Sequence, residues 1–484
     1  MATSGWGSAA PGGAGAGVPA AGPNAVPGGR RGTDRLEALR SRWAAERAAA
    51  SRRRLWNVAF AVVGVVVLDV TGYTLGSGSG RYLLPVAAVA LVVLVRPRHD
   101  RLTVRAATVP DRFVGVLLVY GLLGSLYGAL LGSAQSPSLA VFVPMALALL
   151  HLTTLGPVEE DEAWIFLRRW ALIGAVYVAL HAGTELGILP SLDGDGEQGA
   201  AFGAVFRHEK SFLIAMALAA AWLLRRWGLL VVLGGLTVVL FVAYPAGTYV
   251  LAAIIAVTTL VVTGPRSGRV RTYGMAALVV ALAVVIPLQV TGERAARTGS
   301  LGSTYFSAVG KTDNSETRAR LWGLAVDRIR RSPVVGSGFT GDVSLTVPLS
   351  GRRTAVPPHN DFLQTAMGGG LFAMLLLAGW IVTTNALVVR WCRAAAARRA
   401  EGTYRLLRLL LLGYNSFFAV ALVNPVMSKV GLSAVLMVVY AMMMSVGAPP
   451  AAAEQGTAPV YVAAGRTYEP GSRTVRGVSR GDLT

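Results

Sequence analysis

Long apolar blocks dominate this chain of 484 residues and limit what it can fold into. Examples are WNVAFAVVGVVVLDV from residue 56 and MAALVVALAVVIPLQV from residue 275. Blocks of about 18 or more apolar residues match the hydrocarbon core of a bilayer. The chain is 54% hydrophobic and 14% charged, which leaves few polar residues to cover a soluble globule. A β-barrel would show short alternating segments instead, so the sequence predicts an all-α polytopic membrane protein.

Hydropathy predicts about twelve spans, with one large polar loop between the ninth and the tenth. The predicted spans are residues 55–74, 82–95, 113–132, 137–155, 169–188, 209–224, 228–243, 248–263, 273–290, 367–389, 406–424 and 430–447.

Basic residues are distributed unevenly over the short predicted loops. One side carries 17 of them: Arg96, Arg98, Arg101, Arg105, Arg112, Arg168, Arg169, Arg225, Arg226, Arg266, Arg269, Arg271, Arg390, Arg393, Arg398, Arg399 and Arg405. The other side carries four, namely Arg81, Arg207, Lys210 and Lys429. Because cytoplasmic loops hold the excess of Lys and Arg, both termini are predicted to be cytoplasmic and the loop 291–366 extracytoplasmic. The net charge of +20 then reflects scattered inner loops, and nucleic acid is not an expected partner.

The predicted organisation has five parts. Residues 1–54 form an Ala/Gly/Pro-rich and then Arg-rich cytoplasmic segment, and residues 449–484 a polar tail; both are expected to be disordered. Residues 55–290 hold the first nine spans, residues 291–366 the catalytic loop and residues 367–448 the last three spans. The first residues lack a signal-peptide pattern. Cys392 is the single cysteine, so no disulfide within the chain and no cysteine metal cluster is expected.

The loop 291–366 contains a predicted amphipathic helix over residues 314–331. Asp313 is a candidate cap, with Glu316 three residues later. Ser332-Pro333 ends the helix, and residues 336–338, Gly-Ser-Gly, predict a turn. An apolar stripe follows from helical spacing and comprises Trp322, Ala325, Val326 and Ile329.

Arg318 lies on this apolar stripe by helical spacing, four residues before Trp322. An arginine on a buried face requires an anionic partner. One interpretation is a structural ion pair or a side chain that reaches the lipid headgroups. The other is a phosphate site, because a guanidinium matches phosphate oxygens bidentately.

Two further polar groups are candidates for chemistry. His359-Asn360 follows two prolines that place it at the membrane interface, where a neutral imidazole could accept a proton from a hydroxyl. The alternative is an ordinary helix start, capped by Asn360 or Asp361. Arg207, His208 and Lys210 form a second basic cluster before an apolar span, which is either an anion site or an interfacial anchor.

Three stretches resemble the O-antigen ligase family, which includes related bacterial polysaccharide polymerases. Arg318-x-x-x-Trp322 followed by SPVVGSGF resembles its Arg-x-x-x-Trp and Pro-x-x-Gly-x-Gly motifs. HNDFLQ from His359, followed by GGGLFAMLLLAGW, resembles its His-Asn-x-aromatic-Leu motif and Gly-rich helix. FRHEKSFLIA more loosely resembles a Lys-Asn motif. The specific likeness covers about 80 residues.

The resemblance implies a glycosyltransferase of the bacterial plasma membrane. Such enzymes move a glycan from an undecaprenyl-pyrophosphate carrier to a glycan or lipid acceptor, outside the cell and without a metal or other cofactor. It implies that Arg318 and Trp322 bind the donor with Lys210, Arg207, His208 and Asn360, and that His359 is the base or positions the acceptor. The sequence departs from the family at Ser211, where Asn is usual, and at residues 244–248, which contain no cation. Either one phosphate contact is absent here, or Arg207 or His208 supplies it.

Three other functions are compatible with a polytopic membrane protein. A lipid-linked oligosaccharide flippase or polysaccharide exporter would line a central cavity with charge, and the few candidates are Asp69, His151, His181 and Glu185. The motifs of SEDS-type peptidoglycan polymerases are not recognisable. GT-C glycosyltransferases usually carry an acidic pair in the first outer loop. Here that loop reads GSGSGR, which argues against this class.

Overall fold

A computed structural model describes residues 39, 42–43, 56–61, 63–64, 107–130, 145–146, 158–188, 210–243, 247–264, 314–339, 343–346, 353–356, 358–427, 430–447, 462–463 and 466–467. The chain divides into two units, Met1–Ser51 and Arg52–Thr484. In the first unit the described residues are Leu39, Arg42 and Trp43, which are helical and exposed.

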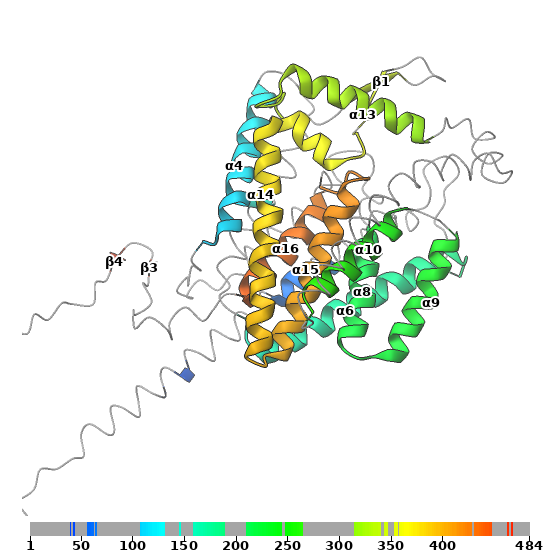
Figure 1. The fold of residues 1–484 in the computed structure, drawn as a ribbon, viewed down its shortest axis with the longest axis vertical. Coiled ribbons are helices and arrows are strands. Elements are labelled where there is room, and N and C mark those ends of the chain that lie inside the picture. The colour runs from blue at the N-terminus through cyan, green and yellow to red at the C-terminus, as the bar shows by residue number, and fades with distance from the viewer. Residues whose placement is uncertain are drawn as a thin grey trace, which may run out of the picture. The chain divides into compact units, whose positions relative to one another are not determined.

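The described part of the second unit is mainly helical (Figure 1). Its helices are α4 (Val109–Leu130), α6 (Glu160–Glu185), α8 (Ser211–Leu223), α9 (Trp227–Ala243), α10 (Gly247–Val262), α13 (Asn314–Arg331), α14 (Asp361–Ala397), α15 (Glu401–Ala421) and α16 (Val430–Gly447). The structure also contains two short pairs of antiparallel strands: β1 (Val343–Thr346) with β2 (Arg353–Val356), and β3 (Val462–Ala463) with β4 (Arg466–Thr467).

Eight of the predicted spans coincide with these helices, and the predicted helix 314–331 is confirmed. Three of them, Val109–Gly128, Glu160–Gly183 and Asp361–Ala397, are long and apolar enough to cross a membrane. The remaining predicted spans lie largely outside the described residues, so the count of twelve stays a prediction. The β1–β2 pair adds a short hairpin to the polar stretch between α13 and α14, and the described part of the chain remains mainly helical, as predicted.

Helix α15 lies at the centre of the described bundle and packs against α6, α8, α10, α14 and α16. Almost every side chain of its second half is buried, which fits its apolar sequence LLLLGYNSFFAVA. Trp380 of α14 and Tyr440 of α16 meet Tyr414 of α15, with ring centroids 5.6 and 6.3 Å from the Tyr414 ring. This aromatic core fixes the three helices against one another.

The longest helix, α14, has 37 residues and a kink at Gly370. Gly370 has φ 64° and ψ −162°, a conformation that essentially only glycine adopts. Helix α4 runs beside α14, and α13 lies across the first turns of α14 (Figure 1). The helix starts six residues before the predicted span at 367 because Asn360 caps it in the loop.

Helix ends that meet in space sort into two groups. The starts of α8, α10 and α14 gather with the α15–α16 connection, and this group is called the His359 end. The starts of α4, α6 and α15 gather with the ends of α8, α10 and α16, and this group is called the Glu160 end. Ser211 Oγ on α8 donates to Thr248 O on α10 at 3.4 Å within the first group, and Tyr440 Oη on α16 donates to Asp111 on α4 at 2.8 Å within the second. Helix ends are expected to group in this way when successive helices run in alternating directions.

Candidate active site

Two glycine-rich segments interlock beside the first turns of α14. Residues 333–338 follow α13, and residues 367–372 surround the α14 kink. Four backbone hydrogen bonds join the segments: Ser337 N to Met367 O at 2.8 Å, Gly338 N to Gly368 O at 3.0 Å, Leu371 N to Pro333 O at 2.8 Å and Phe372 N to Val334 O at 3.2 Å. The SPVVGSGF and GGG motifs, about 30 residues apart in sequence, therefore form one structural unit, which is called the glycine lock.

Glycine is required in the lock for both conformation and space. Gly336 and Gly370 have φ of 70° and 64°, in the left-handed region that favours glycine. A Cβ on Gly336 would lie 2.3 Å from Gly368 O, and one on Gly370 would lie 2.3 Å from Val334 O. Tyr120 of α4 closes the unit by donating to Val335 O at 2.9 Å.

Helix α13 is held against α14 by a small apolar cluster and one polar contact. Leu321 and Ala325 are fully buried against Met367 of α14, whereas Val326, expected on the apolar stripe, is exposed. The indole Nε1 of Trp322 donates to Pro358 O at 2.9 Å. That hydrogen bond brings the Arg-x-x-x-Trp motif to the residue that precedes His359. Arg318 lies in the first half of α13, four residues before Trp322, and its side chain is outside the described part of the chain.

His359 has a backbone conformation that is unusual for its residue type. Its φ is 52°, which costs a non-glycine residue about 1 kcal/mol or more. Asn360 next to it is the N-cap of α14, and its Oδ1 accepts from Phe362 N and Leu363 N at 3.0 Å each. Buried Asp361 accepts from Met427 N at 2.7 Å and ties the start of α14 to the α15–α16 connection. The contacts of Asn360 and Asp361 thus fix the backbone on the C-terminal side of His359. His359 itself is partly exposed.

An aromatic layer connects the start of α14 with the start of α8. Phe362 lies 6.3 Å from Phe418, Phe418 lies 5.8 Å from Phe417, and Phe417 lies 5.3 Å from Phe212, measured between ring centroids. Phe362 follows His359 by three residues, and Phe212 follows Lys210 by two. His359, Asn360 and Lys210, which are predicted to share a site, therefore flank one apolar layer at the His359 end.

Lys210 precedes the first turn of α8 and is only 5% exposed. Ser211 Oγ donates to the backbone oxygen of Thr248 at 3.4 Å. Thr248 is 4% exposed, and its own Oγ1 has no hydrogen-bond partner among the described residues. The starts of α8 and α10 are thus neighbours, and Thr248 leaves a buried hydroxyl free. Arg207 and His208 lie outside the described residues.

A groove of about 720 Å³ runs between α10, α14 and α15. Phe362 lines it toward the His359 end, and Arg390 and Arg393 line it toward the other end, with mostly aliphatic side chains between. Asn385 and Asn415 exchange hydrogen bonds of 2.8 and 2.9 Å in its wall. Their polar groups are satisfied by each other, so the groove offers an apolar surface that could accept a hydrocarbon chain.

A comparison with models of protein families gives a match to part of the chain. Residues 211–378 match the model of a protein family described as O-antigen ligase. The chain resembles the O-antigen ligase family. The matched segment begins with α8 and ends in α14, so it contains the glycine lock, α13, His359 and Thr248. No curated protein matches the chain significantly.

The family and the apolar helices together indicate a bacterial membrane protein related to glycosyltransferases. Asp361 and Met427 are connected by a hydrogen bond, yet Met427 lies beyond the matched segment. The site therefore depends on α15 and α16 as well as on the family segment.

Among the predicted site residues, the structure brings Trp322 of α13 close to His359 and Asn360 at the start of α14. Sequence analysis missed the free hydroxyl of Thr248 because burial and hydrogen bonding are not visible in a sequence. It also missed the role of Gly370, although the GGG run at 368–370 was a usable signal.

Proposed function

We propose that the protein transfers a glycan from an undecaprenyl-pyrophosphate carrier to an acceptor hydroxyl at the outer face of the bacterial plasma membrane. It would act as an O-antigen ligase or a polysaccharide polymerase, which differ only in the acceptor. The observation that carries this proposal is the hydrogen bond from Trp322 to Pro358, which joins the arginine motif to the histidine motif. The family match over both motifs supports it.

In the proposed reaction the acceptor oxygen attacks the anomeric carbon of the donor sugar. Its proton passes to the neutral imidazole of His359 as the new C–O bond forms. The bond between the anomeric carbon and the pyrophosphate oxygen breaks, and undecaprenyl pyrophosphate leaves with the bonding electron pair. Charge grows on the pyrophosphate, and Arg318 and Lys210 are suited to stabilise it.

The surroundings of His359 support its role as the base. Its left-handed backbone conformation is held by the cap at Asn360 and by the contact of Asp361 with Met427. Strain that is retained by its surroundings is characteristic of functional positions. Asn360, which also belongs to the predicted substrate-binding set, then contributes mainly by fixing the helix start.

The groove between α10, α14 and α15 is the proposed path for the carrier's lipid tail. It begins at Phe362, within one helical turn of His359 in sequence, and its lining is mostly apolar. A polyprenyl chain in this groove would hold the pyrophosphate at the His359 end. Thr248 Oγ1, buried in the first turn of α10, is proposed as a hydrogen-bond donor to that pyrophosphate.

The test is His359→Asn, because Asn tolerates the left-handed conformation but cannot act as a base near neutral pH. We expect unchanged expression and thermal stability and glycan transfer reduced about 100-fold or more. Lipid-linked glycan should accumulate in the outer leaflet, measured with an impermeant glycan-modifying reagent on intact cells. The flippase alternative predicts accumulation in the inner leaflet, and unchanged product would remove His359 from the site.

A further inference from the structure

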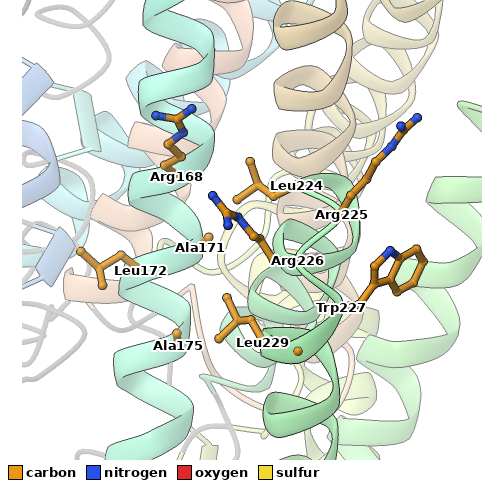
Figure 2. Close-up of a pocket in the computed structure, with 10 residues that line it drawn as sticks. Arg168, Ala171, Leu172, Ala175, Leu224, Arg225, Arg226, Trp227 and Leu229 are labelled. Atoms are coloured by element: carbon orange, nitrogen blue, oxygen red, sulfur yellow. The ribbon is translucent and has the colours of Figure 1, made fainter.

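A second cleft, of about 680 Å³, lies between α6 and the turn that joins α8 to α9. Arg168 of α6 and Arg226 of the turn both line it (Figure 2). Arg226 extends toward α6, whereas Arg225 and Trp227 point to the other side of the turn (Figure 2). This cleft is called the Arg168 cleft, and it is separate from the groove proposed for the carrier.

Nothing in the described residues neutralises these two guanidinium groups. No carboxylate pairs with Arg168 or Arg226 in the part of the chain that the structure covers. Both side chains are exposed, so the two like charges that share the cleft repel each other only modestly. An anion between them would remove that cost and form bidentate hydrogen bonds if it carries phosphate oxygens.

The start of α9 adds a further preference for an anion. Leu230 N donates to Arg226 O at 2.9 Å, the first backbone hydrogen bond of the helix. The amides of Trp227, Gly228 and Leu229 precede it in the first turn, and all three residues line the cleft. A helix start with such amides attracts phosphate, which here would approach beside the two arginines.

The walls of the cleft favour a lipid over a free ion. Ala171, Leu172, Ala175 and Leu229 supply apolar surface next to the arginines, and Leu172 is 64% exposed. Trp227 is 61% exposed, as expected for a ring at the membrane–water interface. Basic residues above an apolar wall match a phosphate headgroup above its acyl chains.

We propose that the Arg168 cleft binds the headgroup of an anionic phospholipid. The bound lipid connects α6 to the α8–α9 turn through its phosphate. Since α8 also carries Lys210 at its other end, the lipid stabilises a helix of the proposed site without touching substrate. The proposal does not depend on which glycan the protein transfers.

The test uses the purified full-length protein in neutral detergent micelles. Short-chain phosphatidylglycerol is titrated in, with short-chain phosphatidylcholine and inorganic phosphate as separate arms, and thermal unfolding and native mass spectrometry are recorded. We expect phosphatidylglycerol alone to raise Tm and to remain bound in the mass spectrum. Arg168→Gln combined with Arg226→Gln should weaken this apparent affinity about tenfold or more.

The matched control is Arg112→Gln combined with Arg398→Gln, which removes the same charge from exposed positions at the Glu160 end. It should keep the affinity of the unmodified protein. Ala175→Trp leaves both arginines in place but fills the apolar wall, and it should also lose the lipid. The proposal would be overturned if the Arg168 cleft variants and the control variant bound phosphatidylglycerol with equal apparent affinity. It would also be overturned if inorganic phosphate alone gave the full rise in Tm.

Discussion

The two ends of the bundle differ in how fully their buried polar groups are paired. At the Glu160 end, polar side chains satisfy backbone groups of neighbouring helices: Arg408 donates to Leu260 O at 2.7 Å, and Tyr404 donates to Thr263 O at 3.1 Å. Among the described residues at the His359 end, the buried atoms Thr248 Oγ1, Gln364 Oε1 and Asn424 Nδ2 have no partner, whereas Trp56 Nε1, beside Phe166 of α6, is an exception toward the Glu160 end. Buried polar groups are normally satisfied, so these unpaired groups fit the proposed binding of a polar substrate at the His359 end.

Backbone strain follows the same division in part. His359 and the glycine lock place four described residues at positive φ around the start of α14, the others being Gly336, Gly338 and Gly370. The Glu160 end also contains Arg225 and Arg399 at positive φ, each at a helix terminus. Strain at that end therefore belongs to ordinary helix termination, whereas strain at the other end surrounds the candidate base.

The largest effect is expected from Gly336→Ala, which adds a Cβ 2.3 Å from Gly368 O at positive φ. The backbone contacts of the glycine lock should break, which lowers the free energy of unfolding by about 3 kcal/mol or more. The yield of folded protein and glycan transfer should both fall. Size-exclusion profiles and Tm measure the first effect. Gly323→Ala is the matched control, because its Cβ meets nothing within 4 Å and a helical Ala should be neutral or stabilising. Equal behaviour of the two variants would show that the lock is dispensable.

The lock also marks the limit of what the sequence could predict. Hydropathy located the helices, and the stop at Ser332-Pro333 was correct because each signal is local. The contact of residues 333–338 with 367–372 joins backbone to backbone, so no side-chain pattern encodes its register. Arg168 and Arg169 were assigned to a loop, yet α6 starts at Glu160 and includes both, because three acidic residues favour its first turn.

The next largest effect should fall on stability alone and concerns Glu160→Ala. The Glu160 carboxylate accepts from Gly402 N, and from Thr403 N and Thr403 Oγ1 at 3.0 and 2.7 Å, so it caps α15 from a different helix. Its removal should cost about 2 kcal/mol and lower Tm, while transfer per folded molecule stays unchanged. Asp161→Ala removes the same charge from an exposed neighbouring position and should have little effect. A specific loss of transfer in Glu160→Ala would contradict the assignment of this end to structure.

A smaller effect, confined to activity, is expected from Arg318→Lys. Lysine keeps the charge but loses the planar fork that matches two phosphate oxygens, so transfer should fall about tenfold, the scale of one charge-assisted hydrogen bond. Arg320→Lys, two residues later and on another face of α13, is the matched control. Transfer assays with purified donor lipid compare the two. If both variants retain full activity, Arg318 does not bind phosphate.

The smallest effect is expected from Thr248→Val, which replaces the free hydroxyl with a methyl group of similar size. Since Thr248 Oγ1 has no partner in the unliganded chain, stability should stay level or rise. If the hydroxyl instead donates to the donor's pyrophosphate, KM for the lipid-linked glycan should rise about fivefold with little change in kcat, the signature of a lost binding contact. Thr237→Val is the control, because that hydroxyl already donates to Leu233 O at 2.7 Å within its own helix, away from the groove. A rise in stability with unchanged KM would make Thr248 an unsatisfied core residue, and the spare polar capacity of the His359 end would then rest on Gln364 and Asn424.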